Sequence, residues 1–175
     1  MLRYSLIFGA IAGVITIAIM VLNMNFGPEE FGSSEVVGYL IMLVVLSLIF
    51  VGVKRYRDVE RGGVIRFLPA LGLGLGIAAV AGVFYVASWE TYVALSGTDY
   101  VESYAAAMIA QAQSLPEAER AAKIAEAESL KALYTNPLTR FGMTFMEVFP
   151  VGVIVALLSA AVLRNPRVLP AKAPA

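Results

Sequence analysis

Four long apolar runs constrain this chain more than any other feature of its sequence. They cover about residues 4–22, 36–53, 67–89 and 141–163. A helix of about 20 apolar residues spans the roughly 30 Å hydrocarbon core of a bilayer. The sequence therefore predicts an all-α protein, in which residues 1–165 form a membrane bundle of four transmembrane helices.

The composition agrees with a membrane protein and excludes several kinds of chemistry. Hydrophobic residues make up 59% of the chain and charged residues 15%, whereas soluble domains carry about 25% charged residues. The chain has no cysteine and no histidine, which excludes disulfides, cysteine–histidine and serine–histidine catalysis, and the usual haem ligand. We expect no metal and no cofactor. The formal net charge is zero, without a long basic run, so nucleic acid is not an expected partner.

The segment between the third and fourth runs, residues 90–136, is the one sizeable polar part of the chain. Its pattern predicts a helical hairpin of residues 99–114 and 115–134, which either lies solvated over the bundle or presents a docking surface to a partner. Asn136 and Pro137 suit the N-cap and the first position of the fourth membrane helix. Ion pairs expected to support the second hairpin helix are Glu119 with Lys123, and Glu128 with Lys131.

Glycines are placed where helices can approach one another closely. Gly9 and Gly13 have the GxxxG spacing, which favours close packing either within the chain or between two copies. The GLGLG stretch at residues 72–76 is similar to a phosphate-binding loop. It lies in an apolar helix and no strand precedes it, so we interpret it as a packing surface. Gly62 and Gly63 are expected to form the turn between the second and third spans.

The distribution of basic residues predicts the orientation of the bundle. With four spans, nine Lys and Arg residues fall on the side of the termini and four on the other side. Basic residues favour the cytoplasmic side. We therefore expect cytoplasmic N- and C-termini, an extracytoplasmic hairpin, and a disordered cytoplasmic tail at residues 166–175.

The fourth apolar run contains a carboxylate. Glu147 lies inside it and Pro150 follows one turn later. A charged residue at the centre of a membrane helix costs roughly 2.5–3.5 kcal/mol on insertion scales. Arg140, Thr144 and Glu147 have helical spacing, so they are predicted to share one face. The functional interpretation is a protonatable site next to a kink at Pro150, and the structural one is a carboxyl group hydrogen-bonded to a neighbouring helix.

The predicted topology brings further polar residues to the same end of the bundle. Glu35 and Glu90 fall near the ends of their spans on the side of Glu147, and Arg140 is the basic residue at the start of a span there. These carboxyl groups would repel one another unless Arg140 pairs with one of them. Such a cluster is either a proton or cation site, or a polar plug between helices.

A second polar cluster follows the second span at the opposite end. It comprises Lys54, Arg55, Arg57 and Asp58. Basic residues at a cytoplasmic helix end attract anionic headgroups by about 1 kcal/mol each. We expect these residues to anchor the helix to headgroups, with Arg57 pairing to Asp58 or to the following loop. A specific ligand or partner site is the alternative.

The motifs of the chain also resemble those of a known family. The matching pieces are GYLIM at 38–42, FVGVKRYRD at 50–58, GG at 62–63, EVFPVG at 147–152 and LSAA at 158–161. With these pieces in this order, the chain resembles a bacterial family of four-helix integral membrane proteins described as a domain of unknown function. The resemblance implies a bacterial inner membrane and the four-span plan, and it implies no activity.

Three functions remain open at this point. The first is an accessory or structural membrane protein that acts through contacts with membrane lipids, with a membrane-protein partner or with further copies of itself. The second is a small transporter or channel that uses Glu147 as its protonatable site. The third is an outer-leaflet enzyme for lipid-linked substrates, with an acid–base pair drawn from Glu35, Glu90, Glu147 and Arg140. Few polar groups converge within the spans, which favours the first function over an enzyme.

Overall fold

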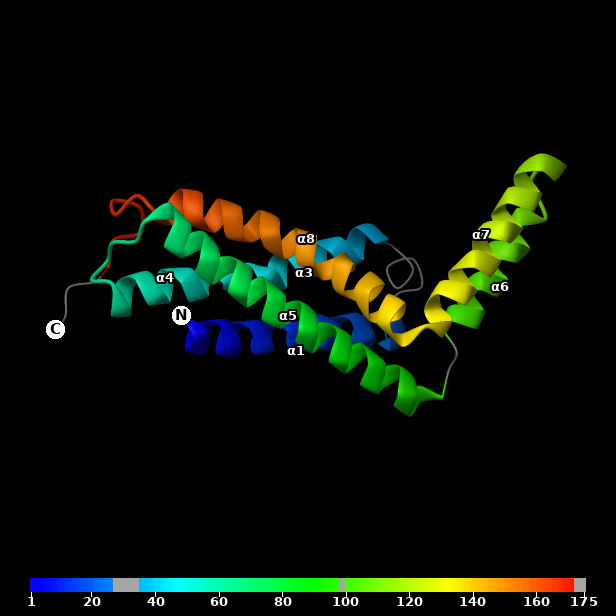
Figure 1. The fold of residues 1–175 in the computed structure, drawn as a ribbon, viewed down its shortest axis with the longest axis horizontal. Coiled ribbons are helices and arrows are strands. Elements are labelled where there is room, and N and C mark those ends of the chain that lie inside the picture. The colour runs from blue at the N-terminus through cyan, green and yellow to red at the C-terminus, as the bar shows by residue number, and fades with distance from the viewer. Residues whose placement is uncertain (27–34, 98–99, 172–175) are drawn as a thin grey trace. The chain divides into compact units, whose positions relative to one another are not determined.

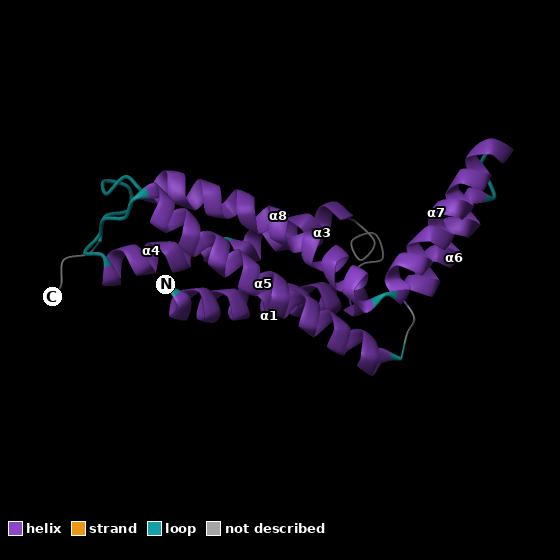
Figure 2. Ribbon diagram, viewed as in Figure 1, coloured by secondary structure: helices purple, strands orange, loops and turns teal. Residues whose placement is uncertain are grey.

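The computed structural model describes residues 1–26, 35–97 and 100–171, and these residues are helical apart from short links (Figures 1 and 2). The helices are α1 (Leu2–Phe26), α3 (Glu35–Leu46), α4 (Leu48–Glu60), α5 (Phe67–Ser96), α6 (Tyr100–Ala112), α7 (Glu117–Thr135) and α8 (Pro137–Leu163). No strand occurs within the described ranges. Four helical segments are long and apolar enough to cross a membrane: Leu2–Asn23, Val36–Glu60, Phe67–Ser96 and Pro137–Leu163. The predicted fold class is therefore confirmed.

The chain divides into two compact units. The first comprises Met1–Ser88 with Phe145–Ala175, and the second comprises Trp89–Thr144. The first unit holds α1, α3 and α4 with most of α5 and α8. The second unit holds the hairpin of α6 and α7, together with the end of α5 and the start of α8.

Glycines bring α1 into close contact with α5 in the first unit. A Cβ atom added to Gly9 would lie 2.6 Å from the Cβ of Val80 and 2.8 Å from the carbonyl oxygen of Ile77. One added to Gly13 would lie 2.8 Å from the Cβ of Phe84. Atoms at these distances would overlap, so no larger residue fits without moving a helix. The GxxxG pair therefore packs within the chain, which was one of the two alternatives for it.

The contact between α5 and α8 uses small residues from both helices. A Cβ on Gly74 would lie 2.8 Å from that of Ala156, and a Cβ on Gly152 would lie 2.7 Å from that of Ala78. Both alanines are fully buried. The glycines of the GLGLG stretch are thus helical, and Gly74 is a packing residue, as the apolar context predicted.

A core of aliphatic side chains fills the space that these close contacts leave. Ile49 of α4 lies 3.4 Å from the position a Cβ would take on Gly74 and 3.7 Å from that on Gly152. It therefore packs where α5 and α8 meet. The other large apolar side chains that are almost completely buried are Leu46, Val53, Leu73, Ile77, Val86, Val148 and Leu163.

The second span is interrupted at Ser47, between α3 and α4. The Ser47 hydroxyl donates to the carbonyl oxygen of Val44 at 2.6 Å, and its N–H lies 3.1 Å and 3.3 Å from the carbonyls of Leu43 and Val44. A serine that bonds back to its own helix competes with the regular backbone pattern and bends the helix. The predicted second span, residues 36–53, lies within the apolar segment Val36–Glu60, which includes this break.

The turn and the cap predicted from local sequence are both present. Gly62 and Gly63 have φ values of +60° and +88° in the link between α4 and α5, a conformation that residues with a Cβ atom rarely adopt. The Asn136 side chain accepts a hydrogen bond from the Leu138 N–H at 2.9 Å. It therefore caps α8, which begins at Pro137.

Helices α6 and α7 pack side by side as the predicted hairpin (Figure 1). Fully buried Ala105 and Ala127, one from each helix, lie in this unit. The ion pairs differ from those expected along α7. Lys123 pairs with Glu126 at 2.7 Å, and this hydrogen bond raises the pKa of Lys123. Lys131 reaches Glu102 of α6 at 2.7 Å, because the short link between the helices brings α6 alongside.

Gly152→Ala should destabilise the bundle. Its new methyl group would meet Ala78, and overpacking of a filled core costs about 1–3 kcal/mol. The matched control is Gly72→Ala, since a Cβ at Gly72 meets nothing within 4 Å. Thermal unfolding of the purified protein in mild detergent should show a lower midpoint for Gly152→Ala only. Equal midpoints for the two variants would contradict this account of the contact between α5 and α8.

Candidate functional site

Glu147 lies on α8, ten residues after Pro137, which is about 15 Å along the helix at 1.5 Å per residue. Its side chain is exposed. The hydroxyl of Tyr85, a residue of α5 that is only 2% exposed, lies 3.4 Å from a carboxylate oxygen of Glu147 and 3.5 Å from the sulfur of Met20 in α1. A hydrogen bond of 3.4 Å is long and therefore weak. The carboxylate thus sits at the edge of the bundle, with one weak tie to its interior.

The other residues predicted to share a face with Glu147 lie in different environments. Thr144 is 2% exposed, although it is less than one turn away from Glu147. Pro150 is exposed, and α8 continues through it to Leu163. The boundary between the buried and exposed faces of α8 therefore runs between Thr144 and Glu147. The kink at Pro150 stays a prediction.

Arg140 forms a bidentate ion pair with Glu90. Its Nε donates to one carboxylate oxygen at 2.8 Å and its Nη2 to the other at 2.5 Å. Both side chains are about one-third exposed. A bidentate arginine–carboxylate pair is the strongest geometry for such an interaction. The pair ties the end of α5 to the start of α8 within the second unit.

Only part of the acidic cluster expected from the topology lies among the residues that the structure describes. The structure brings Glu90 and Arg140 together, whereas Glu147 bonds to Tyr85 in the first unit. The side chain of Glu35 lies outside the described residues. In the described part of the chain, no three acidic side chains are grouped closely enough to hold a metal ion.

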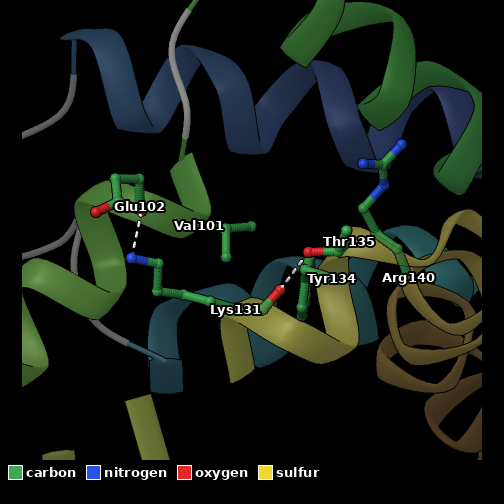
Figure 3. Close-up of a pocket in the computed structure, with 6 residues that line it drawn as sticks. All are labelled: Val101, Glu102, Lys131, Tyr134, Thr135 and Arg140. Atoms are coloured by element: carbon green, nitrogen blue, oxygen red, sulfur yellow. Dashed lines mark hydrogen bonds and ion pairs between the residues drawn. The ribbon is translucent and has the colours of Figure 1, made fainter. Parts of the chain in front are cut away.

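A polar cleft of about 230 Å³ opens in the second unit, at the end of α7 that leads into α8 (Figure 3). Its charged side chains are Glu102 and Lys131, which pair with each other, and Arg140. The Thr135 hydroxyl donates to the carbonyl oxygen of Lys131 at 3.0 Å. The lining residues are Val101, Glu102, Lys131, Tyr134, Thr135 and Arg140. Sequence reasoning missed this cleft, because it forms only when the hairpin closes.

Arg57 is fully buried at the opposite end of the first unit. Its Nη1 donates to the carbonyl oxygen of Val168 at 3.0 Å and its Nη2 to that of Leu169 at 2.5 Å. Its Nε pairs with Asp58 at 2.7 Å, which was one of the expected pairings. Arg57 therefore holds the chain that follows α8, and its buried guanidinium cannot contact headgroups.

A signal for the burial of Arg57 was present in the sequence. Ile49, Val53 and Arg57 are spaced four residues apart on α4, and all three are fully buried. Arg57 thus continues the buried face of the helix. Of the other residues in this cluster, Arg55 is exposed and Lys54, which is 32% exposed, pairs with Asp58 at 2.5 Å.

Residues 164–171, here called the tail segment, follow α8 in a series of turns. Besides the bonds from Arg57, Ala171 lies 3.1 Å from the position a Cβ would take on Gly63. The tail segment therefore packs against the end of α4 and the link that follows it. Disorder of the tail from residue 166 stays a prediction, and residues 172–175 lie outside the described residues.

The family model described as "Protein of unknown function (DUF4199)" matches residues 3–165. The chain belongs to this family. The match covers all four apolar helices, the hairpin and Arg57. Comparison with curated proteins and with solved structures gave no match.

Arg57→Leu should release the tail segment. The substitution removes the N–H groups that Arg57 donates to the carbonyls of Val168 and Leu169. A hydrogen bond to a charged group contributes about 1.5–3 kcal/mol. Because the chain has no cysteine, a spin label at Ala171→Cys reports on this segment alone. Its mobility should rise in Arg57→Leu.

The control for this measurement is Arg55→Leu, which removes an exposed basic residue two positions away. It should leave the mobility of the label unchanged. A label that is equally immobile in Arg57→Leu and in the parent protein would show that other contacts hold the tail segment.

Proposed function

We propose that this protein is an accessory or structural protein of the bacterial inner membrane. It acts through contacts with membrane lipids and with other membrane proteins, which include further copies of itself. The distribution of Lys and Arg supports cytoplasmic N- and C-termini and an extracytoplasmic hairpin. In this orientation Arg57 and the tail segment lie on the cytoplasmic side.

The close packing of the bundle is the observation that carries this proposal. Glycines and alanines join α5 to α8 so tightly that a methyl group would not fit at Gly74 or Gly152. The buried hydroxyls of Thr16 and Ser159 donate to carbonyls of their own helices, at 2.8 Å and 2.6 Å. Substrate sites of transporters instead gather polar groups near the midplane. Contacts of the outer surface are therefore the better-supported mode of action.

Two features suit the surface to contacts at the membrane boundary. Arg55 is exposed at the end of α4, where a basic residue attracts anionic headgroups. Trp89 and Tyr92 of α5 lie with ring centroids 5.8 Å apart, and such rings are enriched at membrane–water interfaces. The hairpin adds a polar surface with a cleft, which suits it to bind a protein partner.

Replacement of residues 99–134 by a short flexible linker should abolish the binding of a protein partner. The tagged parent protein is purified from native membranes in mild detergent. A stoichiometric partner should co-purify with it and be identified by mass spectrometry. The variant should not bring it. The thermal midpoint of the variant bundle serves as the control, since an unchanged midpoint shows that the four spans remain folded. Full-length protein that is purified without any partner would count against the accessory role.

A small transporter or channel is the second candidate, and the exposed carboxylate of Glu147 favours it. Because this carboxylate lies at the edge of one bundle, this candidate involves a path between two or more copies. This candidate predicts flux driven by a proton gradient in vesicles with purified protein, and its loss in Glu147→Gln. Flux that is equal in the two proteins would exclude Glu147 as the protonation site.

A further inference from the structure

One face of α8 is exposed along the part of the helix that is predicted to cross the membrane. Met146, Pro150, Ile154 and Leu158 follow one another at intervals of four residues, and all are exposed. The exposed fractions of Met146, Ile154 and Leu158 are 58%, 55% and 60%. Glu147 adjoins this row and is exposed as well. These five residues are called the α8 face below.

The α8 face carries two polar groups that lipid cannot satisfy. The first is the carboxylate of Glu147, whose hydrogen bond from Tyr85 is long, at 3.4 Å. The second is the carbonyl oxygen of Met146, because Pro150 has no N–H to donate to it. In the hydrocarbon region every polar group needs a partner from protein or water. The α8 face is therefore better suited to contact another protein surface than to contact lipid tails.

A second copy of this chain supplies a partner for the Glu147 carboxyl group. A two-fold axis along the membrane normal places the same residue of each copy at the same depth. A carboxyl group that carries a proton is both a donor and an acceptor, so two protonated Glu147 side chains at one depth can each donate a hydrogen bond to the other and leave no net charge. A different partner would need its own donor at this depth, and no feature of the α8 face specifies one.

We propose that two copies associate through their α8 faces, with the Glu147 carboxyl groups hydrogen-bonded to each other across the two-fold axis. This inference rests on the proposed contact function and names one partner for it. It concerns a surface of the first unit, apart from the hairpin. Polar side chains are known to hold membrane helices together in this way.

Disulfide crosslinking tests the proposal directly, because the chain has no cysteine of its own. Met146→Cys and Ile154→Cys place single thiols on the α8 face. The control is Val44→Cys, which places a thiol on α3 at a residue that is 70% exposed. In native membranes treated with an oxidant, the two α8 variants should form covalent dimers and the Val44→Cys variant should not.

Two substitutions at Glu147 then distinguish the contribution of the hydrogen bond to association from that of the shape of the α8 face. In the Ile154→Cys background, Glu147→Gln should retain the crosslink, because an amide is also a donor and an acceptor. Glu147→Leu should weaken association about tenfold, as expected for the loss of one interhelical hydrogen bond. An unchanged thermal midpoint for the monomer shows that Glu147→Leu is folded.

The remaining outcomes overturn the proposal. They are equal crosslinking of the Val44→Cys variant, no crosslinking on the α8 face, a crosslink that forms to the same extent in Glu147→Leu as in its parent, and a crosslink that is lost in Glu147→Gln. The accessory role is tested separately by capture of a partner through the hairpin. Failure of the dimer with intact partner capture would therefore leave the accessory role in place, and the reverse result would leave the dimer in place.

Discussion

The close approach of α5 to its neighbours is the constraint on which the rest of the bundle depends. Between membrane helices there is little hydrophobic driving force, because lipid tails are as apolar as the side chains. Stability must come from van der Waals contact, and contact improves when backbones come close. Gly9 and Gly13 on α1 and Gly152 on α8 provide this closeness to α5. The same closeness leaves little space inside the bundle, which supports the proposal that the protein acts through its outer surface.

Three charged side chains among the described residues, Arg57, Arg140 and Glu147, differ in how well their hydrogen bonds are satisfied. Arg57 and Arg140 are both held by well-placed acceptors, the first by tail carbonyls and Asp58 and the second by Glu90. Among the described residues, Glu147 receives one long hydrogen bond, from Tyr85. Satisfied ion pairs fasten segments of the chain to each other. A poorly satisfied carboxylate in a span is costly to keep, and this cost is the reason for the proposed contact between the α8 faces of two copies.

The elements of this fold follow from local sequence, whereas the environment of each polar side chain does not. Apolar runs of sufficient length predict the four spans, and Asn136 with Pro137 predicts the start of α8, because these signals involve only neighbouring residues. The burial of Arg57 depends on carbonyls more than 100 positions away along the chain. Helical spacing places Thr144 and Glu147 near one face, but the neighbouring helices decide that one is buried and the other is not. The pairing of Lys131 with Glu102 likewise requires the hairpin to be closed.

The sequence separation within the Arg57 site has a consequence for biosynthesis. Arg57 and its acceptors at Val168 and Leu169 are 111 and 112 positions apart. At a translation rate of about 5–20 residues per second, roughly 5–20 s pass between the synthesis of the donor and that of its acceptors. During this interval Arg57 has only the partners that precede the tail segment, such as Asp58. The end of the bundle that contains Arg57 therefore closes only after α8 and the tail segment have been synthesised.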